Sequence, residues 1–159
     1  MNKILESNAK VRFQDCDPFN HLNNSKYIDY FINAREDQVL KHYNLNIFEH
    51  VATFGKSWVV TSNQIAYLKP VLLMEEIVIE SQLVAFSDSF LPVEMKMFNT
   101  SKTILKSILW TKFTYYDIRN KSKSKHSKEL NELFIGIVNP VEEISFERRC
   151  NNIIQSSKK

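Results

Sequence analysis

The chain has 159 residues, of which 43% are hydrophobic and 12% aromatic, and its formal net charge is +3. This content can fill one core, so we expect a single domain over residues 1–159, with its core at about 10–135. The sequence has no run of about 18 apolar residues, no apolar leader of the secretory type and only two cysteines, which argues for a cytoplasmic protein without a membrane span or a disulfide framework.

The predicted elements begin with a strand and a long helix. Lys10 to Asp15 alternates apolar and polar residues, as a half-buried strand does, and Pro18 stops the pattern. From about Asn24 to Tyr43, apolar residues recur at helical spacing and neither glycine nor proline interrupts them. We therefore expect a helix of about 20 residues, capped by Asn23 or one of the two residues after it.

After Gly55 the pattern changes to extended segments rich in β-branched and aromatic residues. These segments are Ser57 to Leu68, Glu76 to Phe86, Phe90 to Phe98 and Thr103 to Asp117. Turn-forming residues separate them, so we expect a meander of antiparallel strands. One strand, one long helix and then a run of strands predicts an α+β domain in which a curved antiparallel sheet wraps one helix.

The carboxyl-terminal part begins with a lysine-rich loop, Arg119 to Lys128, that carries much of the positive charge. It is either solvated surface or a site for phosphate groups, in nucleic acid or in a nucleotide-bearing cofactor such as coenzyme A. A short helix over about Ser127 to Phe134 follows, which Gly136 would end. The tail, about 137–159, is weakly patterned, and we expect it to fray by Asn151.

The candidate chemistry lies in the segment from Asp15 to Tyr27, which places Asp17 near the start of the long helix. Helix-terminal amides favour negative charge that develops on an oxygen, so a carboxylate beside them is suited to chemistry at an electrophilic carbonyl. Asp17 could equally cap the turn that precedes the helix. A glycine-rich phosphate loop, a Gly-x-Ser-x-Gly elbow and a His-x-x-x-His metal pair are all absent, so we expect no metal and no cofactor.

This segment resembles the signature of a known enzyme family. The run Val11-Arg12-Phe13-Gln14-Asp15-Cys16-Asp17, followed by His21-Leu22-Asn23-Asn24 and Tyr27, is similar to that of hotdog-fold acyl-CoA thioesterases, specifically the 4-hydroxybenzoyl-CoA thioesterase-like group. The likeness extends over roughly Lys10 to Phe134. It implies a hotdog fold and hydrolysis of an acyl-CoA thioester to a carboxylic acid and free coenzyme A.

The resemblance also implies roles for single residues. Asp17 matches the family's catalytic carboxylate, which acts as a nucleophile or as a general base toward water. A backbone amide at the helix start, near Asn24, would polarise the thioester carbonyl. His21 is a candidate acid, base or substrate contact, or a loop histidine bonded to nearby backbone. The family commonly has glycine before this histidine; Asn20 stands here, and asparagine tolerates the left-handed backbone.

Neighbouring residues have simpler interpretations. We expect Asp15 to be solvent-facing or hydrogen-bonded, and Cys16 to pack rather than act as a nucleophile. Asn23 and Tyr27 are candidates for binding substrate. Asn63, together with Gln64 and Tyr67 on the same predicted strand, is a candidate for lining an acyl pocket.

The expected partners follow from the resemblance. Related proteins pair two sheets edge to edge with the active site between subunits, so we expect a homodimer or a homotetramer. Arg119, Lys121 and Lys123 would meet the phosphates of coenzyme A there. We expect no nucleic-acid partner. One alternative is a thioesterase for acyl-carrier-protein substrates. The other is a noncatalytic module that holds an acyl-CoA or lipid, and such a module would not need the Asp17 carboxylate to be directed at the thioester.

Overall fold

The structure is a computed structural model that describes residues 1–159. Its centre is a six-stranded sheet in which all pairs are antiparallel. The strands are β1 (Ile4–Lys10), β2 (Lys56–Tyr67), β3 (Glu76–Leu83), β4 (Phe90–Asn99), β5 (Leu105–Asp117) and β6 (Ser122–Lys123). They follow the order β1-β3-β4-β5-β2, and the short β6 pairs with β5. The edges of the sheet are therefore β1 and β2.

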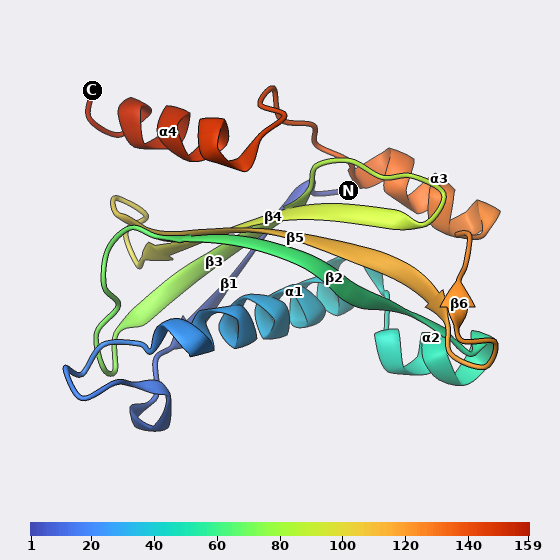
Figure 1. Ribbon diagram of the computed structural model, residues 1–159, viewed down its shortest axis with the longest axis horizontal. Helices are drawn as coiled ribbons and strands as arrows, with labels where there is room; N and C mark the ends of the chain where they lie inside the picture. The colour runs from blue at the N-terminus through green and yellow to red at the C-terminus, as the bar shows by residue number, and fades with distance from the viewer.

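Helices cover both faces of this curved sheet (Figure 1). They are α1 (Tyr27–Tyr43), α2 (Ile47–Phe54), α3 (Lys128–Ile137) and α4 (Phe146–Ser156), and single 3-10 turns occur at Phe13–Asp15 and Asn24–Lys26. The long α1 runs across one face, α2 and α3 lie at one end of the sheet, and α4 lies on the opposite face (Figure 1). None of the helices is long and apolar enough to cross a membrane.

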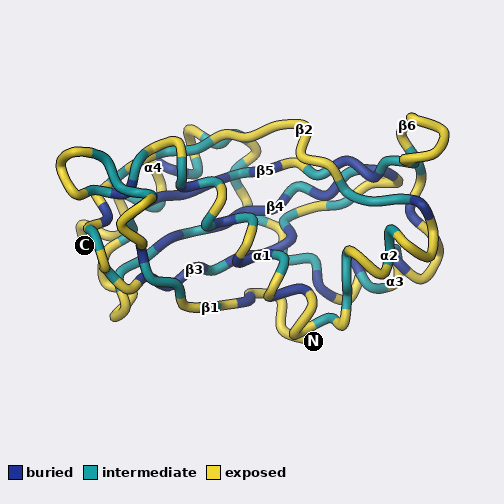
Figure 2. Tube along the Cα trace, turned by 90° about the horizontal axis from the view of Figure 1, so that it is seen from below, coloured by how far each residue is buried: buried dark blue, intermediate teal, exposed yellow.

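The main core lies between α1 and the sheet. Tyr27, Phe31 and Ala34 are buried along one side of α1, at the spacing of one helical face. Alternate residues of β4, including Met95 and Met97, belong to the same cluster of buried side chains. The central strands β3, β4 and β5 carry most of the buried positions of the sheet, whereas β2 is largely exposed (Figure 2).

Most of the predicted elements are confirmed. The structure has the long helix, with its first turn as a 3-10 turn over Asn24–Lys26, and the expected curved antiparallel sheet around it. The helix ends where Asn44 takes the left-handed conformation at a φ of 53°, and its N–H returns to Leu40 O. The four predicted strands after Gly55 all form, within a few residues of their expected ends.

The predicted strand over Lys10 to Asp15 is wrong. The strand is β1, which ends at Lys10, and Phe13–Asp15 forms a 3-10 turn. β1 pairs with β3 up to the partners Lys10 and Glu76, which is the first residue of β3. Because the partner strand ends there, the alternating residues that follow have no ladder to join.

The predicted meander is correct for β3, β4 and β5 but wrong for β2. β2 pairs with β5, at the far edge of the sheet from β1, instead of with β3. Helix α2, which begins after the capping side chain of Asn46, was not predicted. Gly136 does not end α3 but lies within it, where an added Cβ would stand 3.2 Å from Met1 Cε.

The carboxyl-terminal tail is helical where fraying was expected. Ser145 caps α4 by accepting a hydrogen bond from the N–H of Arg148. Arg149 of α4 then binds Glu94 of β4 through two hydrogen bonds of 2.7 and 2.8 Å. Phe146 packs edge-on against Trp110 of β5, with ring centroids 5.7 Å apart. These contacts fix α4 on the face of the sheet opposite α1.

Candidate functional site

Asp17 lies in the loop between β1 and α1, and one of its carboxylate oxygens closes that loop. Oδ1 accepts hydrogen bonds from the backbone N–H groups of Phe19 at 2.9 Å and His21 at 3.1 Å. The Asp17 N–H donates in turn to His21 O at 2.8 Å. The protein donates no hydrogen bond to Oδ2. Asp17 thus organises the turn with one oxygen and keeps the other oxygen available.

The turn depends on an asparagine in the left-handed conformation. Asn20 has a φ of 59°, as its place in the motif predicted. Its carbonyl accepts from Leu73 N–H at 2.9 Å, and Leu22 N–H donates to Val71 O at 2.8 Å. These two bonds attach the loop to the segment that connects β2 and β3. The position of Asp17 is therefore fixed by backbone contacts with a distant part of the chain.

The start of the long helix lies against the same loop. Asn23 Oδ1 accepts from both the N–H and the hydroxyl of Ser25, at 2.9 and 2.8 Å, which caps the first turn. The hydroxyl of Tyr67, near the end of β2, donates to Asn24 O at 2.9 Å. No acceptor within the protein takes the N–H of Asn24, as expected at the first residue of a helical turn. This leaves a backbone donor free at the helix start.

Asp17 and Asn24 line one cavity of about 220 Å³, together with His21, Tyr27 and Tyr67. Its remaining wall is Leu22, Leu68, Lys69 and Pro70. The Tyr27 and Tyr67 rings meet edge to face, with centroids 5.0 Å apart. Burial raises the pKa of Tyr27, so its phenol is neutral at physiological pH. Asp17, His21 and the first residue of the helical turn, Asn24, thus line one space with mixed polar and apolar walls.

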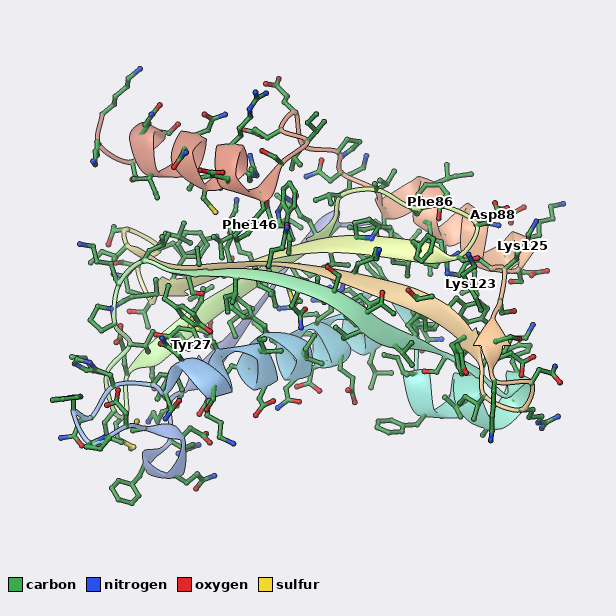
Figure 3. All side chains as sticks on the ribbon, in the orientation of Figure 1. Tyr27, Phe86, Asp88, Lys123, Lys125 and Phe146 are labelled. Atoms are coloured by element: carbon green, nitrogen blue, oxygen red, sulfur yellow. The ribbon has the colours of Figure 1, made fainter.

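Several predicted substrate contacts lie outside this cavity. The Asn23 side chain is used in the cap, and Asn63 stands on the exposed part of β2, four residues before Tyr67. Arg119, Lys121 and Lys123 lie at the end of the sheet next to α2 and β6. In Figure 3, Lys123 lies at the opposite end of the molecule from Tyr27. The lysine Nζ lies 5.1 Å from the Phe90 ring centroid. Within one chain, the basic loop does not contact the Asp17 cavity.

The neighbours of Asp17 in the motif have structural contacts. Asp15 Oδ2 accepts a hydrogen bond of 2.7 Å from the hydroxyl of Tyr30, as expected for a hydrogen-bonded carboxylate. Cys16 packs against the core, and its thiol donates to Arg12 O at 3.5 Å. Burial, with the charges of Asp17 and Asp15, raises the pKa of this thiol, which opposes a nucleophilic role. Neither side chain lines the cavity.

Sequence reasoning missed Lys69, an exposed residue that lines the Asp17 cavity. Its position directly before Pro70, in a connection rather than a strand, is the signal that would have marked it as a loop residue. The role of Tyr67 in holding the helix start depends on the pairing of β2 with β5 and could not be read locally. No group of three or more His, Cys, Asp or Glu side chains is arranged to hold a metal ion.

Comparison with known proteins gives a consistent result. The sequence model of the thioesterase-like superfamily matches residues 11–134. The long-chain acyl-CoA thioesterase FadM of Escherichia coli is 29% identical over 79 residues, which cover 50% of this chain. The match spans only 58% of that relative's own length.

Solved structures share the arrangement of elements. The YbaW probable thioesterase from Escherichia coli has a TM-score of 0.72 at 21% identity, over 85% of this chain and 99% of that one. The DHNA-CoA thioesterase from Staphylococcus aureus has a TM-score of 0.78 at 15% identity, over 86% of this chain and 91% of that one. The hypothetical protein SAV2348 from Staphylococcus aureus, solved in complex with CoA, has a TM-score of 0.78 at 12% identity, over 92% of this chain and 91% of that one. The fold is the expected hotdog fold.

Proposed function

We propose that this chain, which belongs to the thioesterase-like superfamily, hydrolyses an acyl-CoA thioester to a carboxylic acid and free coenzyme A. One observation carries the proposal. Asp17, whose carboxylate has an oxygen free of hydrogen bonds from the protein, lines the same cavity as Asn24, whose backbone N–H has no partner in the protein. Thioester hydrolysis needs a group that attacks or deprotonates water and a donor for the oxyanion, and this cavity supplies both.

Asp17 and Asn24 can catalyse this hydrolysis by either of two mechanisms. As a general base, Asp17 takes a proton from water while the water oxygen bonds to the thioester carbon. The N–H of Asn24 donates to the oxyanion, the C–S bond breaks, and the proton passes to the leaving thiolate. As a nucleophile, Asp17 bonds to the acyl carbon itself, coenzyme A leaves, and water then cleaves the mixed anhydride. Hydroxylamine would trap that anhydride on the peptide that contains Asp17, whereas general-base catalysis would leave the peptide unmodified.

Other cavity residues have supporting roles in this proposal. His21 lines the cavity with Asp17, and its side chain makes no hydrogen bond within the protein, so it is free to relay the proton from Asp17 to the leaving thiolate. The ammonium of Lys69 at the rim is placed to meet an anionic part of the substrate. The Tyr27 and Tyr67 rings supply part of the apolar wall.

The test is replacement of Asp17 by Asn, assayed by release of free thiol from a panel of acyl-CoA substrates. Turnover should fall by about 10²-fold to 10⁴-fold, the usual contribution of a catalytic base, with unchanged thermal unfolding. Asp29→Asn is the matched control, because Asp29 is an acidic residue in the first turn of α1 and outside this cavity. Full activity in the Asp17 variant would disprove the assignment. Coenzyme A binding without any turnover by the natural chain would indicate a noncatalytic module instead.

We also propose that two copies pair through β2. β2 is a sheet edge, and Val59 and Val60 on it are 40% and 42% exposed. An open edge with exposed apolar side chains favours pairing with another strand, and a second copy supplies one. Light scattering should give the mass of a dimer or tetramer, and the double change Val59→Glu with Val60→Glu should give monomers. Ile144→Glu, at a 91% exposed loop position, is the control that should not change the mass.

In such a dimer, the basic loop of one copy would approach the active site of the other. Arg119, Lys121 and Lys123 would then contact the phosphates of coenzyme A, which they do not reach within their own chain. Charge-reversing changes at all three should raise the KM for an acyl-CoA substrate and leave kcat nearly unchanged. An unaltered KM would show that the loop is solvated surface.

A further inference from the structure

A second candidate site lies around Arg35, in the middle of α1. The Arg35 side chain is buried, with the residue only 9% exposed. None of the protein's ion pairs includes it. Burial lowers its pKa to about 10, which still leaves the guanidinium charged at neutral pH. A buried positive charge without a carboxylate partner is costly, so a bound anion would be strongly favoured.

The polar groups near Arg35 do not neutralise it. Its Nη1 donates to Ser81 Oγ at 2.9 Å, and the Tyr43 hydroxyl lies beside the guanidinium. Ser81 in turn donates to Gln38, whose amide donates to Ser7 Oγ and to Ile79 O. These neighbours are neutral and are largely engaged with one another. Several N–H donors of the guanidinium fork therefore have no acceptor in the protein.

Arg35 forms part of the wall of an otherwise apolar cavity. Twelve of the thirteen residues that line this cavity are hydrophobic, and Arg35 is the exception. The walls come from α1, the start of α2, the sheet and α3, and include Val39, Trp58, Leu83 and Phe134. Leu133 of α3 is only half-buried and lies at the rim. The cavity shares no residue with the one around Asp17, and Arg35 stands eight positions after Tyr27, about 12 Å along α1.

The size of the cavity limits the ligand. Its volume is about 70 Å³. One water molecule occupies roughly 10–15 Å³ on the same measure, so the cavity holds about five or six non-hydrogen atoms. A planar carboxylate matches the guanidinium fork through paired hydrogen bonds, and a short alkyl group matches the apolar walls. A phosphate or sulfate would leave those walls without an apolar partner.

We infer that this cavity binds a short-chain monocarboxylate of about four carbons, with its carboxylate on Arg35 and its alkyl group among the apolar side chains. The site is separate from the Asp17 cavity. The inference does not depend on the proposed thioesterase activity.

Trp58 provides a direct probe, because it lines the cavity. In a Trp110→Phe background Trp58 is the single tryptophan, since the chain has two. Sodium butyrate is added in place of an equal concentration of sodium chloride, so that the ionic strength stays constant. It should change the Trp58 fluorescence saturably and raise the Tm. Butanol and butylammonium carry the same alkyl group without the negative charge, and they should bind at least tenfold more weakly. Acetate should also bind more weakly, because it leaves the apolar walls unfilled.

Two variants test the placement. Arg35→Met removes the charge at similar length, and Leu133→Phe narrows the cavity while it leaves Arg35 in place and Trp58 as the single tryptophan. Each should weaken butyrate binding at least tenfold, and the second keeps the test decisive if the first does not fold. Asp17→Asn is the control for binding at the other cavity and should not alter the titration. The inference is overturned if butyrate gives no saturable response, if butanol binds as tightly, or if Leu133→Phe binds butyrate as well as the parent does.

Discussion

The contact between Arg149 of α4 and Glu94 of β4 permits a quantitative test of what fixes α4 to the sheet. The Glu94 side chain is 1% exposed. Burial raises its pKa, but hydrogen bonds from Arg149 and Trp110 and the charge of Lys96 outweigh burial and hold the pKa at about 2, against 4.5 for a free glutamate. This difference corresponds to about 3 kcal/mol in favour of the charged carboxylate in the folded protein.

Replacing Arg149 by Met should therefore lower the free energy of unfolding by about 3 kcal/mol at pH 7, because it leaves a buried carboxylate without its main partner. Since the folded pKa of Glu94 lies below the unfolded value, its contribution is fully present above pH 4.5 and is lost as the pH falls toward about 2. The difference between the natural chain and the variant should narrow over that range.

Urea denaturation at a series of pH values measures this difference. Arg148→Met is the matched control, because Arg148 is the preceding residue of α4, is exposed and forms no ion pair; its effect should stay within about 0.5 kcal/mol. Adding Glu94→Gln to the Arg149 variant should restore part of the stability by removing the buried charge. A loss below about 1 kcal/mol, or a difference that does not change with pH, would refute the reasoning.

Three further predictions concern the core and the Asp17 loop. His126 Nε2 accepts a 3.0 Å hydrogen bond from Trp58 Nε1, and burial lowers the His126 pKa from 6.5. Its stabilising contribution is therefore present above pH 6.5 and is lost as the pH falls below it; urea midpoints should show this decline in the natural chain and a smaller decline in His126→Gln, where His50, whose pKa is also lowered by burial, still contributes. Asn20→Gly should keep full activity and Asn20→Val should lower the Tm, because valine resists a φ of 59°; equal Tm values would contradict this. Tyr67→Phe removes the hydrogen bond to Asn24 O and should lower kcat about tenfold with little change in Tm; unchanged kcat would show that the helix start is positioned without it.

The elements that could be predicted were those that short-range patterns specify. The spacing of Tyr27, Phe31 and Ala34 along α1 and the β-branched runs after Gly55 are properties of neighbouring residues. The motif from Asp15 to Tyr27 likewise placed a carboxylate next to a helix start. The structure gives that segment a specific form, in which Asp17 closes the loop with one oxygen.

The mistakes concern features that depend on distant partners. The alternation after Lys10 has no strand to pair with, because β3 begins at Glu76. Helix α4 is held by Glu94, 55 residues away in the sequence, and a local pattern does not reveal such an anchor. Gly136 lies within α3, where an added Cβ would stand 3.2 Å from Cε of the distant Met1, a contact that no local pattern reveals.

The sequence by itself determined the fold class, the family and the carboxylate on which the proposed chemistry depends. Tertiary structure decided which groups share a cavity with it. Tyr67 and Lys69 join Asp17 because β2 ends beside the start of α1, whereas Asn63 and the basic loop do not. It also placed Arg35 in an apolar cavity without a counterion. Helix and turn preferences act between residues a few positions apart, but burial and strand pairing join residues far apart in the chain, so only the folded molecule defines the two cavities.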